Sequence, residues 1–203
     1  MSGATVTARE AQASPTEERD GRKLRSQDSR ARIVASMLDL IREGEVSPSA
    51  ETVASRANVG LRTVFRHFKD MDSLYREMSD EIERQVIAIR DQPFAAADWR
   101  GRLMELIDRR FMVFERIAPF KRASEAVRHR SRFIGQDSSR LVVALREILK
   151  RVAPPAEVGD PQVFEALDLL LSFETWSRLR REQGLSQEEA CDVLKAVVRK
   201  LTA

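Results

Sequence analysis

The chain has 203 residues, of which 42% are hydrophobic and 33% are charged, and its net charge is +3. This balance excludes a largely disordered chain, because enough apolar side chains are present to fill a core. No apolar run approaches the length of a membrane span, and the first residues lack the basic and apolar regions of a secretory signal, so we expect a cytoplasmic protein that does not contact a membrane.

The N-terminal segment, residues 1–25, contains almost no large apolar side chains, so burial would not offset the entropy lost on ordering it. We therefore expect a disordered arm over residues 1–25. The arm ends in a basic stretch, and Arg30 and Arg32 follow soon after it. Such a stretch is either a solvated tail or an arm that reaches into a nucleic-acid groove.

Beyond the arm, apolar residues recur at steps of three and four and nowhere alternate over the length of a strand. This periodicity predicts an all-α fold of about nine helices. Glycine and proline mark the ends of the helices, because neither residue readily continues one. We expect helices over residues 28–43, 49–57, 61–68, 70–90, 98–117, 119–130, 132–152, 161–182 and 186–202.

Residues 49–68 are the most informative segment, since they predict two short helices joined by a tight turn at residues 58–60. Two short helices on a three-residue turn that contains glycine is the layout of a helix-turn-helix. On the second helix, Leu61, Val64 and Phe68 fall on one side and are expected to pack against the first helix. The side chains expected to face outward are Arg62, Thr63, Arg66 and His67.

This outward set suits contact with DNA, because arginine bonds guanine edges or phosphates and the smaller polar groups reach the backbone. No Asp or Glu occurs from Val59 to Lys69, so no carboxylate in this segment would repel phosphate. Two arginines on a helix are equally compatible with an ordinary solvated face. The pattern of charge alone therefore leaves both interpretations open.

The run RANVGLRTVFRHFKDMDSLY resembles the helix-turn-helix of TetR-type transcription regulators. The matching positions are Ala57, Val59, Thr63, Val64, Phe65, His67, Phe68 and Leu74. The chain departs from the family pattern at the turn glycine, the capping serine, the tyrosine of the second helix and the lysine of the next, where it has Asn58, Gly60, Phe65 and Met71. The resemblance covers residues 28–76 and implies a sequence-specific DNA-binding regulator.

The resemblance also implies roles for single residues in this segment. Ser49, Thr63 and His67 would bond phosphates. From their own chemistry and outward position, we expect Arg62 and Arg66 to read bases or phosphates. Phe65 stands at the tyrosine position without its hydroxyl group, and Lys69 would supply the positive charge missing at Met71. The expected DNA-contacting residues are Ser49, Arg62, Thr63, Phe65, Arg66, His67 and Lys69.

By the same resemblance, residues 26–76 form the DNA-binding domain and residues 77–203 form a helical ligand-binding and dimerisation domain. The predicted helix 161–182 is apolar around most of its circumference, so we expect it to pack on the body and on a partner subunit. With the last helix it would form a four-helix interface of a homodimer that binds a palindromic operator. The expected interface residues are Phe164, Leu167, Leu171, Val193, Leu194, Val197 and Leu201.

Phenylalanine and methionine side chains gather in the middle of the chain, where members of the family often enclose an inducer. These residues either form ordinary core or line a pocket for a small apolar ligand, because flexible Met and flat Phe suit an adaptable cavity. The candidate pocket residues are Met104, Phe111, Met112, Phe114, Phe120, Phe133, Phe173 and Trp176.

No catalytic or metal-binding pattern is recognisable, since the chain has two histidines, one cysteine and no glycine-rich phosphate loop. We expect no enzymatic activity, no metal and no cofactor. The sequence thus favours a ligand-responsive repressor that binds duplex DNA as a homodimer. The alternative is an α-helical adaptor that recognises another protein through its amphipathic helices and does not bind DNA.

Overall fold

The structure is a computed structural model that describes residues 15–127 and 132–203, and residues 1–14 of the expected arm lie outside the described residues. Helices joined by short connections make up this part of the chain, and no strand occurs within it, which confirms the all-α prediction. The elements are α1 (Pro15–Arg42), α2 (Ala50–Arg56), α3 (Leu61–His67), α4 (Met71–Arg90), α5 (Trp99–Val127), α6 (Arg132–Val152), α7 (Pro155–Val158), α8 (Pro161–Leu170), α9 (Phe173–Ser177), the π-helical turn η2 (Arg178–Glu182) and α10 (Gln187–Leu201).

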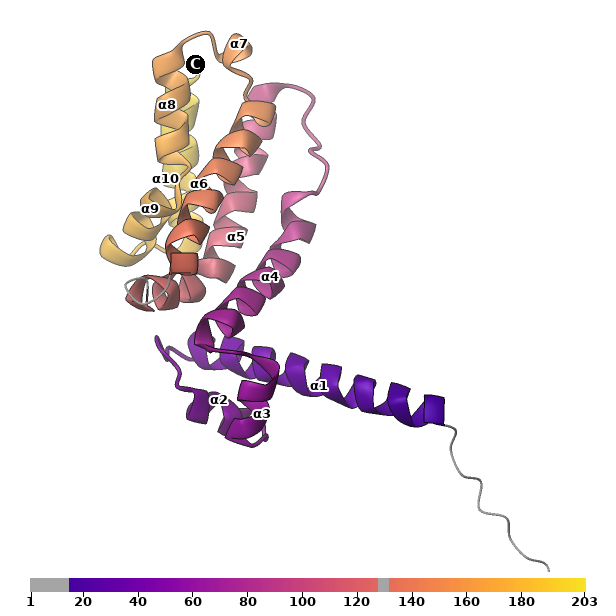
Figure 1. Cartoon of the computed structure of the whole chain (residues 1–203). Coiled ribbons are helices and arrows are strands. Elements are labelled where there is room, and N and C mark those ends of the chain that lie inside the picture. The colour runs from indigo at the N-terminus through magenta and orange to yellow at the C-terminus, as the bar shows by residue number, and fades with distance from the viewer. Residues whose placement is uncertain (1–14, 128–131) are drawn as a thin grey trace, which may run out of the picture.

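The first three helices form a small bundle, which we call the head. Figure 1 shows α2 and α3 lying together against one side of α1, and all three helices contact one another. Their shared core includes the fully buried side chains of Ile33, Met37, Val53 and Val64. The apolar stripes of three short amphipathic segments are buried in this way, and short helices need such tertiary packing because they are marginal alone.

Helices α5 to α10 form the rest of the fold, which we call the body. The long helix α5 lies at its centre and contacts α4, α6, α9 and α10 (Figure 1). Helix α4 leaves the head and runs up to the body, and α1 also contacts α5. The head and the body therefore share one continuous buried core, and α4 crosses the expected domain boundary at residue 76.

Helix α1 begins at Pro15, so residues 15–25 are helical where the sequence predicted a disordered arm. Proline suits the first position of a helix, because it lacks only an N–H group that would have no partner there. The residues that follow are mostly Glu, Arg and Lys, which are good helix formers. Continuity with the buried second half of α1 supplies the nucleus that a short isolated helix lacks.

Helix α5 runs through Pro119, where the sequence predicted a break between two helices. Proline removes one backbone hydrogen bond, to the carbonyl of Glu115. On both sides of it, however, Ile117, Ala118 and Phe120 are buried in the core, and this packing offsets the lost bond. Tertiary burial thus overrides the local preference of proline.

The predicted helix 161–182 is divided in the structure. Ser172 ends the regular run after α8, because its hydroxyl accepts a hydrogen bond from the Thr175 N–H (3.2 Å) and caps the separate helix α9. The π-helical turn η2 then follows α9 directly, and a further short helix, α7, forms inside the predicted loop before residue 161. None of the helices in residues 15–127 or 132–203 combines the length and apolarity needed to cross a bilayer.

The predicted start of the last helix is confirmed. Gly184 has a φ of +71°, in the left-handed region that favours glycine, and it ends the preceding turn. Ser186 then accepts a hydrogen bond from the Glu189 N–H, while the Glu189 side chain accepts one from the Ser186 N–H. This reciprocal capping box fixes where α10 begins.

Candidate nucleic-acid interface

The turn between α2 and α3 is built as the sequence predicts. Ser49 caps α2, and its hydroxyl accepts a hydrogen bond from the Thr52 N–H at 3.1 Å. After α2 ends, Asn58 takes a φ of 52°, a left-handed conformation that asparagine tolerates better than most residues. The Val59 N–H then donates to the Ala54 carbonyl at 3.0 Å, which holds the turn closed. The chain reverses here and α3 starts at Leu61.

The inner face of α3 is anchored by Val64 and by Phe68 just after the helix, both of which are buried. Leu61, expected on the same face, is exposed instead. Side chains on a helix lean toward its N-terminus, so that of the first residue extends past the helix end rather than onto the core. Two of the three expected anchors are therefore observed.

The outer face of α3 is basic and open to solvent. Arg62, Phe65, Arg66 and Lys69 are all exposed, with Phe65 49% exposed, and Thr63 is half-buried. Gly60 precedes the helix and has no side chain to accept a hydrogen bond from the first N–H groups of α3, although its carbonyl accepts one from the Thr63 N–H at 2.8 Å. The outer face combines positive charge with a planar aromatic ring, both of which suit contact with a phosphate backbone and base edges.

His67 differs from its expected outward position. Its side chain is half-buried, and its Nε2 atom is fully buried without a partner among the described residues. The pKa of His67 is lowered below 6.5, mainly because the ring is partly buried. The positive charges of Arg66 and Arg30 lower it further. His67 is the last residue of α3, and its main-chain carbonyl is bonded by Arg30 of α1. The imidazole is thus held neutral at neutral pH, and the ring does not lie freely on the outer face.

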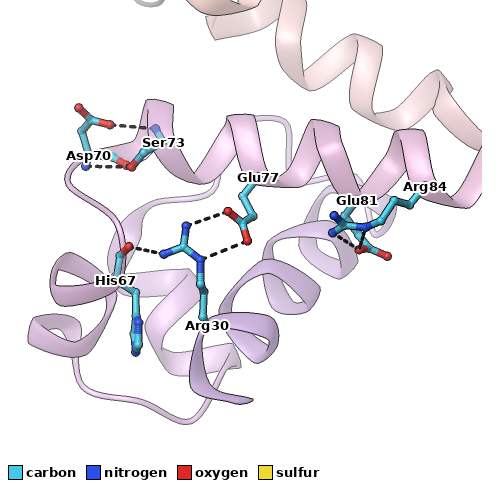
Figure 2. Close-up of polar contacts among 7 residues, drawn as sticks. All are labelled: Arg30, His67, Asp70, Ser73, Glu77, Glu81 and Arg84. Carbon is cyan, nitrogen blue, oxygen red and sulfur yellow. Dashed lines mark hydrogen bonds and ion pairs between the residues drawn. The ribbon is translucent and has the colours of Figure 1, made fainter. Parts of the chain in front are cut away.

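Arg30 of α1 occupies the space behind the end of α3 (Figure 2). Its Nη1 donates to the main-chain carbonyl of His67 at 2.7 Å, and its guanidinium lies 4.4 Å from the centre of the Phe68 ring. The other edge of the guanidinium bonds both carboxylate oxygens of Glu77 on α4, at 3.1 and 2.7 Å. One side chain therefore joins three helices of the interface.

The role of Arg30 was missed in the sequence, where it counts only as one basic residue after the arm. A signal was present, because Arg30 lies three and four positions before Ile33 and Val34 and therefore falls on the apolar stripe of its helix. A charged residue on a buried stripe needs partners. In this fold the partners are Glu77 and the carbonyl of His67.

The start of α4 fixes the exit from α3. The Asp70 carboxylate accepts a hydrogen bond from the Ser73 N–H at 2.8 Å, and the Ser73 hydroxyl donates to the Asp70 carbonyl at 2.7 Å (Figure 2). Negative charge at this position also matches the positive end of the helix dipole. Asp70 thus has a structural role at the end of the basic segment.

A cavity of about 440 Å³ lies between α4, α5 and α6. Of the expected pocket residues whose side chains the structure describes, Phe120 lines this cavity and the others do not. Phe114, Phe173 and Trp176 instead pack on one another, with ring centres 5.0 to 6.1 Å apart, and Phe111 is buried in the core as well. Met112 is exposed, Met104 is packed against the core, and the side chain of Phe133 lies outside the described residues. Phe111 and Met112 line a second cavity between α5 and α10, while Phe114, Phe173 and Trp176 fill the space between their helices.

The expected dimer residues divide into two sets. Phe164, Leu167, Leu171 and Leu194 are buried within the chain, because α8 and α10 pack against each other and the core. Val193 and Val197 are 45% and 43% exposed on α10, and Leu201 is half-buried. Leu169 on α8, which the sequence did not single out for an interface, is more exposed than either valine. The outward apolar surface therefore comprises Leu169, Val193 and Val197.

Two solved structures share this fold. A candidate transcriptional regulator from Streptomyces coelicolor A3(2) is 22% identical, covers 86% of this chain and 98% of its own, and has a TM-score of 0.63. A candidate fatty acid metabolism regulator from Clostridium perfringens is 13% identical, covers 85% of this chain and 98% of its own, and has a TM-score of 0.56. No protein-family model and no curated protein matches the sequence. At these identities the likeness shows the fold.

Proposed function

We propose that the protein is a DNA-binding transcription regulator of the TetR type that acts as a ligand-responsive repressor. The observation that carries the proposal is the outer face of α3, where Arg62, Phe65, Arg66 and Lys69 are exposed together on a helix-turn-helix. The acid-free segment leaves phosphate free to approach. The fold shared with two candidate regulators supports the same function.

In this proposal α3 lies in the major groove. Arg62 and Arg66 contact base edges or phosphates, while Ser49 and Thr63 contact phosphates from the starts of α2 and α3. Phe65 contacts the sugars or a thymine methyl group, since it has no hydroxyl to bond phosphate. The proposed role of His67 is narrower than the family pattern implies, because its side chain is half-buried and its Nε2 atom is not open to solvent.

One such head covers too few base pairs for tight binding, and we propose that two copies of the chain bind one palindromic operator. The proposed contact between them is formed by Leu169, Val193 and Val197 on α8 and α10, because burying these exposed side chains against a second copy would remove apolar surface from water. The two-fold axis of such a dimer would set the spacing of the two half-sites.

The regulatory part of the proposal rests on α4. This helix lines the cavity through Ile82 and Val86 and carries Glu77, which is bonded to Arg30 behind α3. A ligand that favours one position of α4 would shift the population of head positions and hence the affinity for DNA. The ligand must bind the two positions with different affinities for this to occur.

Salt-dependent binding to duplex DNA tests the DNA-binding function. We expect the affinity for a selected duplex to fall steeply with salt, and Arg66→Ala to weaken specific binding by roughly 1–3 kcal/mol. Arg62→Ala should weaken binding as well, whereas Arg151→Ala, an exposed arginine on α6, should not. Equal affinities of the wild type and both α3 variants for DNA at two salt concentrations would show that α3 does not contact DNA.

A further inference from the structure

The cavity between α4, α5 and α6 has the size and lining of a small-molecule site. Its volume of about 440 Å³ lies within the range of known ligand pockets. Its apolar wall comes from all three helices and includes Ile82, Val86, Leu106, Val113, Leu145 and Ile148. An apolar chain would therefore displace water from apolar surface along most of the cavity.

Arg110 of α5 also lines the cavity, and its guanidinium is buried, with 4% of the residue exposed. Its Nη1 and Nη2 donate to the main-chain carbonyls of Leu171 and Leu145, both at 2.6 Å. Its Nε is buried and has no partner among the described residues. Arg110 thus retains donor capacity beside the cavity.

No carboxylate among the described residues bonds this guanidinium. Asp168 is near enough to favour its charge, but the Asp168 carboxylate bonds Arg146 instead, at 2.7 Å. Burial lowers the pKa of Arg110 to about 10, which still leaves it charged at neutral pH. A buried charge without an ion-pair partner costs stability that an arriving anion would restore.

The other charged side chains that line the cavity also carry a net positive charge. Six of its side chains are basic and two, Asp80 and Glu83, are acidic. Glu83 lies 3.9 Å from Arg90, which also bonds Asp91. Lys121 and Arg140 add positive charge on α5 and α6, so the cavity attracts anions and disfavours cations.

We propose that this cavity binds an amphipathic carboxylate, with its apolar chain along the wall of α4, α5 and α6 and its headgroup against Arg110. A neutral ligand of the same shape would leave the Arg110 charge uncompensated, and a cationic one would be repelled. The proposal deepens the ligand-responsive part of the proposed function and rests on that function only for its effect on DNA.

The test compares decanoate, its methyl ester and decylamine on the full-length protein below their micellar concentrations, by calorimetric titration and thermal unfolding. We expect decanoate to bind one site per chain, to raise the unfolding temperature saturably, and to bind at least about tenfold more tightly than the ester, because only it gains a charge-assisted bond. Decylamine should not bind measurably. Equal affinities for the three headgroups, or the absence of binding by all three, would overturn the proposal.

Variants of the cavity locate the site. Val113→Trp places a large ring into the cavity without touching the charge, and it should weaken decanoate binding at least about tenfold. Val142→Trp, on the exposed side of α6 outside the cavity, is the matched control and should leave binding unchanged. Binding that is insensitive to Val113→Trp would overturn the proposal.

Arg110 itself is tested by two substitutions. Arg110→Gln should remove the preference for decanoate over its ester, and Arg110→Lys, which keeps the charge, should retain most of it. If Arg110→Gln does not fold, the comparison of decanoate, its methyl ester and decylamine, together with Val113→Trp, still tests whether the cavity binds a carboxylate. Wild-type protein that binds decanoate but no DNA would overturn the proposed function alone, and protein that binds DNA but not decanoate would overturn this inference alone.

Discussion

Arg30 of α1 and Glu77 of α4 form a two-bond ion pair behind the end of α3, with N–O distances of 3.1 and 2.7 Å. The same guanidinium bonds the main-chain carbonyl of His67 and lies over the Phe68 ring. The helix proposed to read DNA is therefore attached to the helix that lines the cavity through a single side chain.

Replacing either partner should destabilise the head. Both side chains are partly exposed, so we expect a double-mutant cycle of Arg30→Met and Glu77→Gln to give a coupling of about 0.5–1 kcal/mol. Arg30→Met should cost more than Glu77→Gln, because it also removes the bond to the His67 carbonyl. Chemical unfolding measures both effects, and the exposed Glu81–Arg84 pair of α4, expected to couple by less than about 0.5 kcal/mol, is the control. A coupling near zero for Arg30 and Glu77 would contradict the attachment.

The same pair should make stability depend on pH. The hydrogen bond from Arg30 holds the pKa of Glu77 below its ordinary value of 4.5. A lowered pKa in the folded state contributes stability that is present above pH 4.5 and is lost as pH falls through the lowered value. Glu77→Gln should therefore lose less stability than wild type on acidification from pH 5. Parallel pH profiles for the two proteins, measured by urea unfolding, would show that the bond does not form in solution.

Two serines that cap helices allow an effect on stability to be distinguished from an effect on DNA binding. Ser49→Ala and Ser186→Ala each remove a hydroxyl that caps a helix, α2 and α10, and each should cost about 1 kcal/mol of unfolding free energy. Ser49→Ala alone should also weaken DNA binding, because its hydroxyl is exposed beside the proposed interface. Thermal unfolding and DNA titration of both variants check this. Equal DNA affinities would assign Ser49 a capping role only.

The proposed dimer contact predicts a dissociated but folded protein. Val193→Glu and Val197→Glu place charges on the exposed apolar surface of α10, where little intrachain packing is lost. Each variant should sediment as a monomer, with helical content unchanged in its circular dichroism spectrum. Val142→Glu changes a valine that is 55% exposed on α6 and should leave the dimer intact. Dissociation by the α6 variant and not by the α10 variants would place the contact elsewhere.

Local signals in the sequence predicted much of this fold. Apolar spacing located the helices of the head, and the capping box of Ser186 and Glu189 located the start of α10, since both signals depend only on nearby residues. The tight turn at residues 58–60 was likewise predicted, and Asn58 takes a left-handed conformation within it. The exposed basic face of α3 followed from the same helical geometry.

The remaining features depend on contacts between distant residues. Pro119 stays inside α5 because of what packs around it, and Arg30 gains its role from Glu77, which lies 47 positions away. The cavity between α4, α5 and α6 could not be outlined from the sequence, because a cavity is the space that side chains leave and no periodicity reports it. The half-buried position of His67 was not predicted for a similar reason, since burial at the end of α3 depends on tertiary packing.

Selection of duplex DNA from a random pool by the full-length protein tests the central claim most directly. The account predicts that sequencing of the bound DNA yields an inverted repeat whose two halves are protected together, and that Arg66→Ala loses this selection. Recovery of no preferred sequence, with binding that does not weaken as salt rises, would contradict the claim and favour the adaptor alternative.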